Sequence, residues 1–432
     1  MDESRPLGAV RGAALYVGAL IGPGLLLVPA LAVQSAGAAS IVAWAGLLVL
    51  SAPLAIVFGA LGVRHPVAGG VSAYVREGLG PVAAAVTGGW FAAAVVIGAP
   101  TVALIGGYYV SALAGGGTAV AAATGLAMYV AVFGANALGL RLSSTLQLAL
   151  ASVLVVVLAV AIGIALPSRG GDHWTPFAPH GWWAVGTAAN ILVWLFVGWE
   201  AGAQLAGEFR RPERDLPRAI ALAFGFVTVL YVGLAIATIG VTAGTRSKVP
   251  LADLIAVGLG RAGRDATAVL AVVLTMGTMN VYTGGAAKLV ASLAQERALP
   301  AWFAADAELS VPRRPLLGFA LTAAPIFAAL IAGFGSTGAL VRATSACFIA
   351  VYLLALASAC RILDGWTRVA AFASVALVVV LAAFSSGYLL VPVVSALVSL
   401  GVLRWLDGHG LVAADEHPLD LDPVVQHDEI GG

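Results

Sequence analysis

The chain has 432 residues, of which 61% are hydrophobic and 10% are charged, and its mean hydropathy is +1.00. Soluble domains are about 25% charged, so this composition excludes a soluble globular protein and indicates one that is integral to a membrane. The formal net charge of +1 argues against binding to nucleic acid. Cys347 and Cys360 do not have the spacing of a metal or redox site, and we expect neither a metal site nor a cofactor.

Apolar runs long enough to cross a bilayer recur along the whole chain, which predicts an all-α integral membrane protein. We expect twelve transmembrane helices, at residues 8–33, 38–62, 82–112, 117–138, 145–166, 183–208, 218–243, 265–290, 314–334, 338–360, 367–385 and 387–404. The mixed segments 69–81 and 251–260 are expected to form short surface helices on the inner and outer sides, respectively.

The distribution of basic residues predicts the orientation of the chain. With a cytoplasmic N-terminus, the inner loops and termini carry fifteen basic residues: Arg5, Arg11, Arg64, Arg76, Arg141, Arg210, Arg211, Arg214, Arg218, Arg297, Arg313, Arg314, Arg361, Arg368 and Arg404. The outer loops carry five, which are Arg169, Arg246, Lys248, Arg261 and Arg264. This positive-inside bias predicts a multi-pass protein of a bacterial-type cell membrane with both ends in the cytoplasm. Residues 1–7 form the N-terminus, and residues 406–432 are an acidic tail that we expect to be disordered.

The first apolar run contains Gly22-Pro23-Gly24 near its middle. Proline lacks a backbone N–H, glycine weakens a helix, and freed backbone groups in lipid need other partners. The sixth run has Gly198, Gly202 and Gly207 around Glu200, which is the acidic residue expected deepest in the membrane. A carboxylate there is costly and is usually functional, as a proton carrier or a gate, although it can also brace two helices.

The two interrupted runs stand five spans apart. Because five is odd, two sets of five helices would cross the membrane with opposite topology, and interrupted helices at matching positions indicate a transporter binding site. A half-helix N-terminus binds an anion, and unwound carbonyls bind a cation, so a zwitterionic amino acid suits both. The alternative is that the glycines only permit close packing of helices.

The sequence also resembles a known family. The segments GALIGPGLLLVP (18–29), FVGWEAGAQLAGEFRRPERDLPRAI (196–220) and KLVASLAQERALP (288–300) resemble the first, sixth and eighth helices of the amino acid–polyamine–organocation (APC) superfamily. Residues 53–75 look closest to the branch that contains the methionine and branched-chain amino-acid exporter of enteric bacteria. The resemblance implies a LeuT-type core of two inverted five-helix repeats, 8–166 and 183–361, with two peripheral helices at 366–405.

The resemblance also implies site residues. The substrate carboxylate is expected at the amides of Gly22, Gly24 and Leu25, because Pro23 has no N–H. The amino group is expected near the carbonyls of Leu20, Ile21, Trp194 and Val197, close to Gly198, with Trp194 over the substrate side chain. Glu200 aligns with a carboxylate that is linked to gating or proton sensing.

The expected pocket is apolar and is lined by Trp194, Phe196, Val197, Trp199, Ile97 and Pro100. We therefore predict a transporter of neutral hydrophobic amino acids such as leucine or methionine, with export inferred from the branch resemblance. Protons are the favoured coupling ion, since the fifth span lacks a lysine and Thr275 and Thr278 are weak evidence for sodium. The alternatives are an importer, an exchanger or a transporter-like sensor. A membrane enzyme is disfavoured, because it would need a buried nucleophile with a base and the apolar runs offer none. The sequence does not indicate an oligomeric state.

Overall fold

The computed structural model describes residues 7–64, 70–140, 142–167, 171–200 and 206–408. Within these ranges the chain is helical, and the only β-type pairing is an isolated bridge between Leu7 and Phe209. Among the described residues, ten helical segments are long and apolar enough to cross a membrane. The predicted all-α membrane fold is therefore confirmed at this level. Most of the N-terminus and of the predicted acidic tail lies outside the described residues.

The first half of the chain begins with an interrupted segment. It consists of α1 (Ala9–Leu20), the short 3₁₀ helix η1 (Pro23–Leu26) and α2 (Val28–Ala36). The remaining helices are α3 (Ser40–Arg64), α4 (Gly70–Leu79), α5 (Pro81–Ala114), α6 (Thr118–Ala137) and α7 (Ser144–Ala165). Local chemistry fixes several of these boundaries: Pro81 starts α5 without losing a needed donor, and Ser143 caps α7 by accepting a hydrogen bond from Leu146 N at 3.2 Å.

The second half also begins with an interrupted segment, α8 (Trp183–Leu192) followed by η4 (Val193–Phe196). It continues with α10 (Pro212–Thr242), α11 (Pro250–Gln295), α12 (Arg313–Ile331), α13 (Thr337–Ile362), α14 (Gly365–Ala383) and α15 (Leu390–Gly408). Helix α11 has a kink at Gly260, where φ is +58°. The kink separates the predicted short helix at 251–260 from the long apolar part of α11.

The count of ten differs from the predicted twelve for a physical reason. The first and sixth predicted spans are the broken ones, so neither contains one continuous helix of spanning length within the described residues. These two predicted spans instead contain the shorter apolar helices Ala9–Leu20 and Trp183–Phe196. The helices α2 and α3 follow each other closely, so Val28–Arg64 counts as one of the ten segments.

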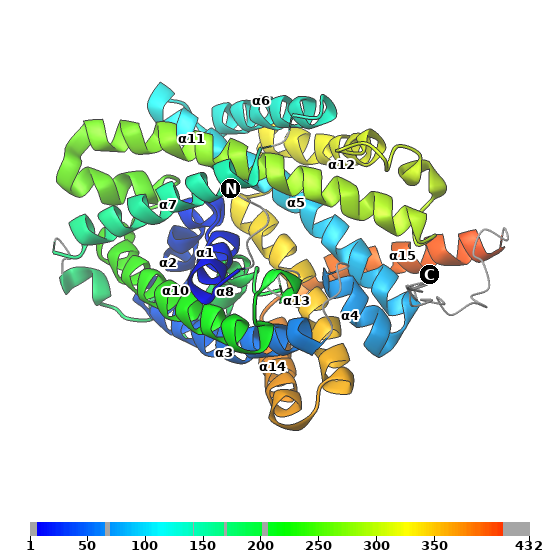
Figure 1. Ribbon diagram of the computed structural model, residues 1–432. Helices are drawn as coiled ribbons and strands as arrows, with labels where there is room; N and C mark the ends of the chain where they lie inside the picture. Colours follow the sequence, from blue (N-terminus) through cyan, green and yellow to red (C-terminus); the bar gives the residue numbers. More distant parts are fainter. Residues whose placement is uncertain (1–6, 65–69, 141, 168–170, 201–205, 409–432) are drawn as a thin grey trace, which may run out of the picture.

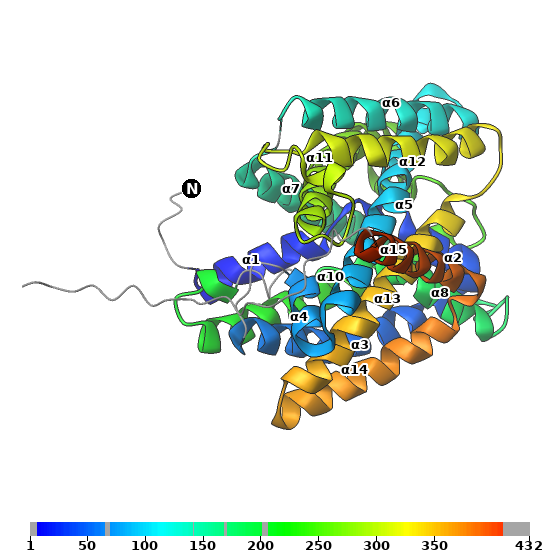
Figure 2. The same cartoon turned by 90° about the vertical axis from the view of Figure 1, so that its right-hand side faces the viewer.

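The broken segments lie near the centre of the molecule in the view of Figure 1, whereas in Figure 2 α1 lies to the left and α2 and α8 lie to the right. In Figure 1, α1, α2 and α8 are grouped near the centre, between α10 on one side and α13 on the other. Figure 2 shows that α6, α11 and α12 lie together at the top of the molecule and that α14 lies at the opposite edge. The helix α4 packs against α5 and α13, and Arg76 on it forms an ion pair with Glu296 at the end of α11.

The turn between α14 and α15 is attached to α8 through polar contacts. Asn190 on α8 donates to Ser385 Oγ at 2.8 Å and accepts from Arg342 Nε at 3.4 Å. The Arg342 guanidinium also donates to the Phe384 carbonyl at 3.4 Å and lies 4.4 Å from the centre of the Tyr388 ring. Arg342 thus joins α13, α8 and the turn between α14 and α15.

Candidate functional site

The first interruption leaves a short piece of extended backbone between two helices. Ile21 (φ −91°, ψ 105°) and Gly22 (φ −132°, ψ 178°) follow the end of α1, and η1 begins directly after them at Pro23. Proline at this first position costs nothing, because the first amides of a helix have no internal acceptor in any case. The expected opening of the first span at Gly22-Pro23-Gly24 is therefore present in the structure.

The backbone amides at this break are only partly used. Among the described residues, the N–H groups of Gly22 and Gly24 have no acceptor, whereas Leu25 N donates to the Gly22 carbonyl at 3.1 Å. The Ile21 carbonyl likewise receives no hydrogen bond from the described part of the chain. Two free amides and a free carbonyl thus lie within four residues, which can bind both ends of a zwitterion.

The second interruption follows the same plan. Helix α8 passes into η4, which ends at Phe196, and Val197 is extended with φ −78° and ψ 136°. Gly198 has φ +134°, a conformation that L side chains rarely adopt. Residues 201–205, which include Gly202 of the predicted weak point, lie outside the described residues.

The two interruptions touch each other through glycines. A Cβ atom on Gly198 would lie 3.0 Å from the carbonyl oxygen of Ala19, just before the first break. A Cβ atom on Gly24 would lie 2.8 Å from Cδ2 of Leu195, within the second break. Gly198 therefore allows the second break to approach the backbone of the first closely, whereas at Gly24 the contact is with the movable end of the Leu195 side chain.

A tyrosine on α10 bridges the two breaks. The Tyr231 hydroxyl lies 3.1 Å from the Leu20 carbonyl oxygen and 2.8 Å from the Leu195 carbonyl oxygen. One hydroxyl carries one proton and can donate to one carbonyl at a time. Its ring is held by Phe196 and Trp44, at centroid distances of 5.2 and 5.3 Å. Tyr231 is thus a fixed point that orients the carbonyls of both segments.

The carboxylate of Glu200 is held beside the second break. Its Oε2 accepts a 2.6 Å hydrogen bond from the Tyr352 hydroxyl on α13 and a 3.0 Å hydrogen bond from the Gly198 amide. The Gly198 amide is also 3.3 Å from the Tyr352 hydroxyl. Among the described residues no Lys, Arg or His forms an ion pair with Glu200. Because neutral donors hold the carboxylate, it is able both to brace the break and to accept a proton.

The breaks face a narrow apolar cavity, which we call the central cavity, with a volume of about 60 Å³. Of the predicted site residues, Leu20, Gly22, Gly24, Trp194 and Val197 line it. Other lining residues come from α1, η1, η4 and three long helices: Ala19, Pro23, Leu195, Ala94, Val95, Gly98, Ala99, Val102, Met279, Tyr282, Thr344 and Phe348. The remaining predicted site residues do not line it: Ile21, Leu25 and Gly198 are chain neighbours of lining residues, and Glu200 accepts from the Gly198 amide.

Four of the residues expected to line the pocket lie elsewhere. Phe196 packs on Trp44, and Trp199 packs on Tyr16 with only 1% of its surface exposed. Ile97 and Pro100 lie on α5, but that helix faces the central cavity with Ala94, Val95, Gly98, Ala99 and Val102. These five positions share one helical face, which excludes Ile97 and Pro100.

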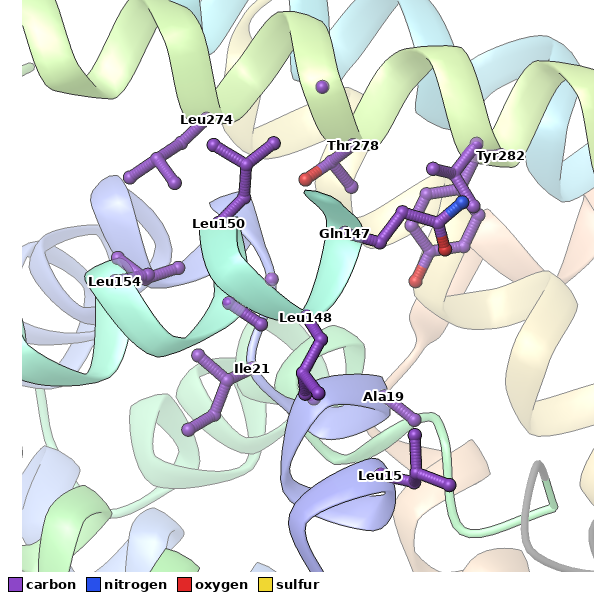
Figure 3. Close-up of a pocket in the computed structure, with 15 residues that line it drawn as sticks. Leu15, Ala19, Ile21, Gln147, Leu148, Leu150, Leu154, Leu274, Thr278 and Tyr282 are labelled. Carbon is purple, nitrogen blue, oxygen red and sulfur yellow. The ribbon is translucent and has the colours of Figure 1, made fainter. Parts of the chain in front are cut away.

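A larger cavity of about 300 Å³ lies beside the first, and we call it the α7 cavity because five of its lining residues are on α7. Figure 3 shows that leucines from α1, α7 and α11 surround it, together with Gln147, Thr278 and Tyr282. Ile21, one of the predicted site residues, lines this cavity. The hydroxyl of Thr275 is used within its own helix, donating to the Ala271 carbonyl at 2.6 Å, whereas Thr278 faces the cavity.

Comparison with known proteins identifies the family. The sequence model of the amino acid permease family matches residues 7–402. This chain belongs to the amino acid permease family. The permease is 31% identical over 419 residues to the uncharacterized amino acid permease YecA of Bacillus subtilis, covering 94% of this chain and 97% of that protein. It is also 31% identical over 380 residues to the L-methionine/branched-chain amino acid exporter YjeH of Escherichia coli, covering 84% and 88%.

The APC-type resemblance is therefore confirmed, and the chain is a multi-pass membrane permease, a class of protein that moves solutes and does not in general transform them. The sequence predicted the two breaks but not the residues of α11 and α13 that line the central cavity. Tyr282 and Thr344 were available signals, since both are polar-tipped residues within apolar runs.

Proposed function

We propose that this permease is a secondary active transporter of neutral hydrophobic amino acids such as leucine and methionine. The observation that carries the proposal is the pair of glycine amides, Gly22 and Gly24, which have no acceptor among the described residues and lie beside the free Ile21 carbonyl at the edge of an apolar cavity. Fixed backbone donors and acceptors bind the α-carboxylate and α-ammonium groups that all amino acids share, and the apolar walls select the side chain.

In the proposed complex the carboxylate accepts hydrogen bonds from the amides of Gly22 and Gly24. The Leu25 amide donates to the Gly22 carbonyl at 3.1 Å in the structure. When the substrate binds, its carboxylate replaces that carbonyl as the acceptor for the Leu25 amide. The ammonium group donates to the carbonyls of Leu20 and Ile21 on one side. On the other side it donates to those of Trp194 and Val197.

The substrate side chain extends between Trp194, Val95 and Phe348. No Lys, Arg, Asp, Glu or His is among the described residues that line the central cavity, so a charged side chain would be buried there without a partner. This favours neutral substrates. At about 60 Å³ the cavity holds only a few water molecules, so binding requires its walls to move apart.

We further propose that Glu200 couples transport to protons by antiport, because it is a carboxylate held by neutral donors beside the break. The alternative coupling ion is sodium, for which the hydroxyl of Thr278, a residue that lines the α7 cavity, is a candidate ligand. Export is proposed because the Escherichia coli relative is an exporter. An importer, an exchanger of the same substrates and a transporter-like sensor remain the alternatives.

The proposed architecture has twelve membrane-spanning helices in the bacterial cell membrane, with both termini in the cytoplasm. Residues 8–166 and 183–361 form two inverted repeats of the LeuT type, in which the interrupted segments α1–α2 and α8–η4 occupy matching places. Residues 366–405 belong to the two peripheral helices, of which α15 continues to Gly408, and the rest of the predicted acidic tail lies outside the described residues.

A counterflow assay tests the substrate class independently of the driving force. Purified protein in liposomes loaded with unlabelled leucine or methionine is expected to accumulate external labelled leucine transiently, whereas liposomes loaded with lysine or glutamate are not. Equal accumulation with lysine or glutamate would contradict the assignment to neutral substrates. Saturable binding of leucine without any exchange would instead indicate a sensor.

A further inference from the structure

A long groove of about 460 Å³ lies between α6 and α12, which pack against each other at one edge of the molecule (Figures 1 and 2). On α12 the lining positions run from Arg313 to Phe327 and recur every three or four residues, so they form one face of the helix. At 1.5 Å per residue this face is about 21 Å long, and the lining stretch 126–137 of α6 is about 17 Å long. One leaflet of a hydrocarbon core that is about 30 Å thick measures about 15 Å, so the groove has the length of a lipid acyl chain.

Small residues open the groove, and aromatic residues form its floor. A Cβ atom on Gly134 would meet nothing within 4 Å. Tyr129 and Phe327 are buried below, with 5.3 Å between their ring centres, whereas Val130 and Leu317 on the rim are 60% and 50% exposed. Both helices have the length and apolar character of membrane spans. The apolar rim of the groove therefore faces the surrounding lipid.

A cation stands at one end of the groove. Arg313 is exposed, and its Nε donates to the Ala137 carbonyl at 2.9 Å, which holds the guanidinium beside the end of α6. Among the described residues its two Nη groups have no acceptor, and it forms no ion pair.

The charged neighbours of Arg313 are occupied elsewhere. Asp306 accepts from the backbone amides of Arg313 and Arg314 through one oxygen, Oδ2. The Arg314 guanidinium donates to the Trp302 carbonyl at 3.1 Å and lies 5.4 Å from the centre of the Trp302 ring. The Nη groups of Arg313 thus remain as a planar pair of donors, the arrangement that binds two oxygens of one phosphate.

The depth of this cation suits a lipid head group. Arg313 is among the basic residues predicted on the inner side, and Trp302 beside it is 46% exposed. Tryptophan is enriched at the boundary between membrane and water, so this end of the groove has the character of that boundary. From here the groove continues along the apolar residues of α12 to Phe327. Its cation and its apolar walls therefore follow each other as a phosphate and an acyl chain do in a lipid.

We propose that this groove binds an anionic phospholipid of the inner leaflet, with one acyl chain between α6 and α12 and the phosphate at the Arg313 guanidinium. The described lining residues include one cation and no Asp or Glu, so the groove complements an anionic head group and favours phosphatidylglycerol over zwitterionic phosphatidylcholine. None of its lining residues lines the central cavity or the α7 cavity, so the lipid site is separate from the proposed transport path.

Native mass spectrometry of the delipidated full-length protein tests the site, because it counts bound lipids directly. In a titration with phosphatidylglycerol, Arg313→Gln is expected to raise the dissociation constant about fivefold, the factor for one contact between arginine and an anionic lipid. Ala324→Trp, which fills the groove from an exposed position, should weaken binding by a similar factor. Phosphatidylcholine should bind more weakly, and Arg313→Gln should not change its binding.

Two matched controls distinguish the groove from the rest of the surface. Arg297→Gln removes another exposed basic residue of the predicted inner side, and Ala131→Trp adds an indole at an exposed position of α6 outside the groove. Both should bind phosphatidylglycerol like the parent. Arg313→Lys keeps the charge without the planar pair of donors and should lie between the parent and Arg313→Gln, so the charge can be tested even if the glutamine variant does not fold.

Several results would overturn the proposal. One is parent-like binding of phosphatidylglycerol by folded Arg313→Gln and Ala324→Trp, and another is an equal loss in the two control variants. Phosphatidylcholine that binds the parent as tightly as phosphatidylglycerol would also contradict an anionic site. A parent dimer that Ala324→Trp converts to a monomer would assign the groove to a second copy of the chain instead of a lipid.

Discussion

The Tyr352 hydroxyl donates a 2.6 Å hydrogen bond to Oε2 of Glu200, and it does so across the gap between α13 and the second broken segment. The same oxygen accepts from the Gly198 amide, so one carboxylate oxygen holds the unwound backbone and a neighbouring helix together. Protonation of this carboxylate would weaken both hydrogen bonds, because a charged acceptor binds more strongly than a neutral one. The pair therefore connects a proton to the geometry of the break.

The first prediction concerns Glu200→Gln. Glutamine keeps an oxygen that accepts from Tyr352 and Gly198, so folding is expected to be preserved, with a thermal midpoint within a few degrees of the parent. It cannot take up a proton, so the pH dependence of leucine exchange in liposomes should disappear. An unchanged pH profile in this variant would reduce Glu200 to a structural brace.

The second prediction concerns Gly198→Ala. The backbone at φ +134° disfavours a side chain, and the new Cβ atom would lie 3.0 Å from the Ala19 carbonyl oxygen. We expect a loss of stability of about 1–3 kcal/mol, measured as a lower midpoint of thermal unfolding in detergent. The matched control is Gly207→Ala, which has nothing within 4 Å and should change stability by less than about 0.5 kcal/mol. Equal effects at both sites would refute the proposed close contact of the two breaks.

The third prediction concerns Tyr231→Phe. The change removes the hydroxyl between the Leu20 and Leu195 carbonyls and should cost about 1 kcal/mol of stability. It should also weaken leucine binding severalfold, because the Leu20 and Leu195 carbonyls lose the hydroxyl that orients them. Tyr129→Phe is the control, since that hydroxyl donates to the Phe319 carbonyl far from the breaks. Equal leucine affinities for the two variants would contradict a role for Tyr231 in the site.

The fourth prediction concerns the size of the substrate. A Cβ atom on Gly98 would lie 3.4 Å from Thr344 Cγ2 and 3.9 Å from Trp194, which is ordinary contact, so Gly98→Ala should fold normally. The added methyl group fills part of the central cavity and should lower leucine and methionine exchange more than alanine exchange. Gly46→Ala on α3, which meets nothing within 4 Å, is the control. A uniform loss for all three substrates would argue against a side-chain subsite at Gly98.

The fifth prediction compares two arginines. Arg342→Met removes contacts to Asn190, Phe384 and Tyr388 and should destabilise the fold by about 1–3 kcal/mol, with little dependence on salt, because its described partners are uncharged. Arg76→Gln removes an ion pair with Glu296 whose side chains are 48% and 42% exposed, and should cost at most about 1 kcal/mol. Thermal unfolding at low and high salt distinguishes them. A loss of stability at Arg342→Met that depends strongly on salt concentration would contradict the contacts described for Arg342.

The all-helical fold and the place of the first break were predictable from local chemistry. Gly22-Pro23-Gly24 cannot continue a helix, and apolar runs of spanning length do not depend on tertiary contacts. The lining of the cavity was less predictable, because it depends on which face of each helix turns inward. On α5 the sequence offers Ile97 and Pro100 as readily as Val95 and Gly98, and its nearly uniform apolar character gives no periodic signal to choose between them.

The partners of Glu200 show the same limit. Its place within the sixth apolar run can be read from the sequence, whereas its hydrogen bond to Tyr352 joins residues 152 positions apart and depends on how α13 packs beside the break. A contact between residues so far apart in the chain produces no local pattern, so a single sequence does not predict it.

The most direct test of the central claim is amino-acid efflux driven by a pH gradient. Liposomes containing the purified protein are loaded with labelled leucine or methionine, and the outer solution is made acidic relative to the interior. We predict saturable efflux that increases with the gradient, as proton antiport through the site at the two breaks requires. Efflux that ignores the gradient but responds to external amino acid would contradict proton coupling, and no efflux of either substrate from folded protein would contradict the proposed transport.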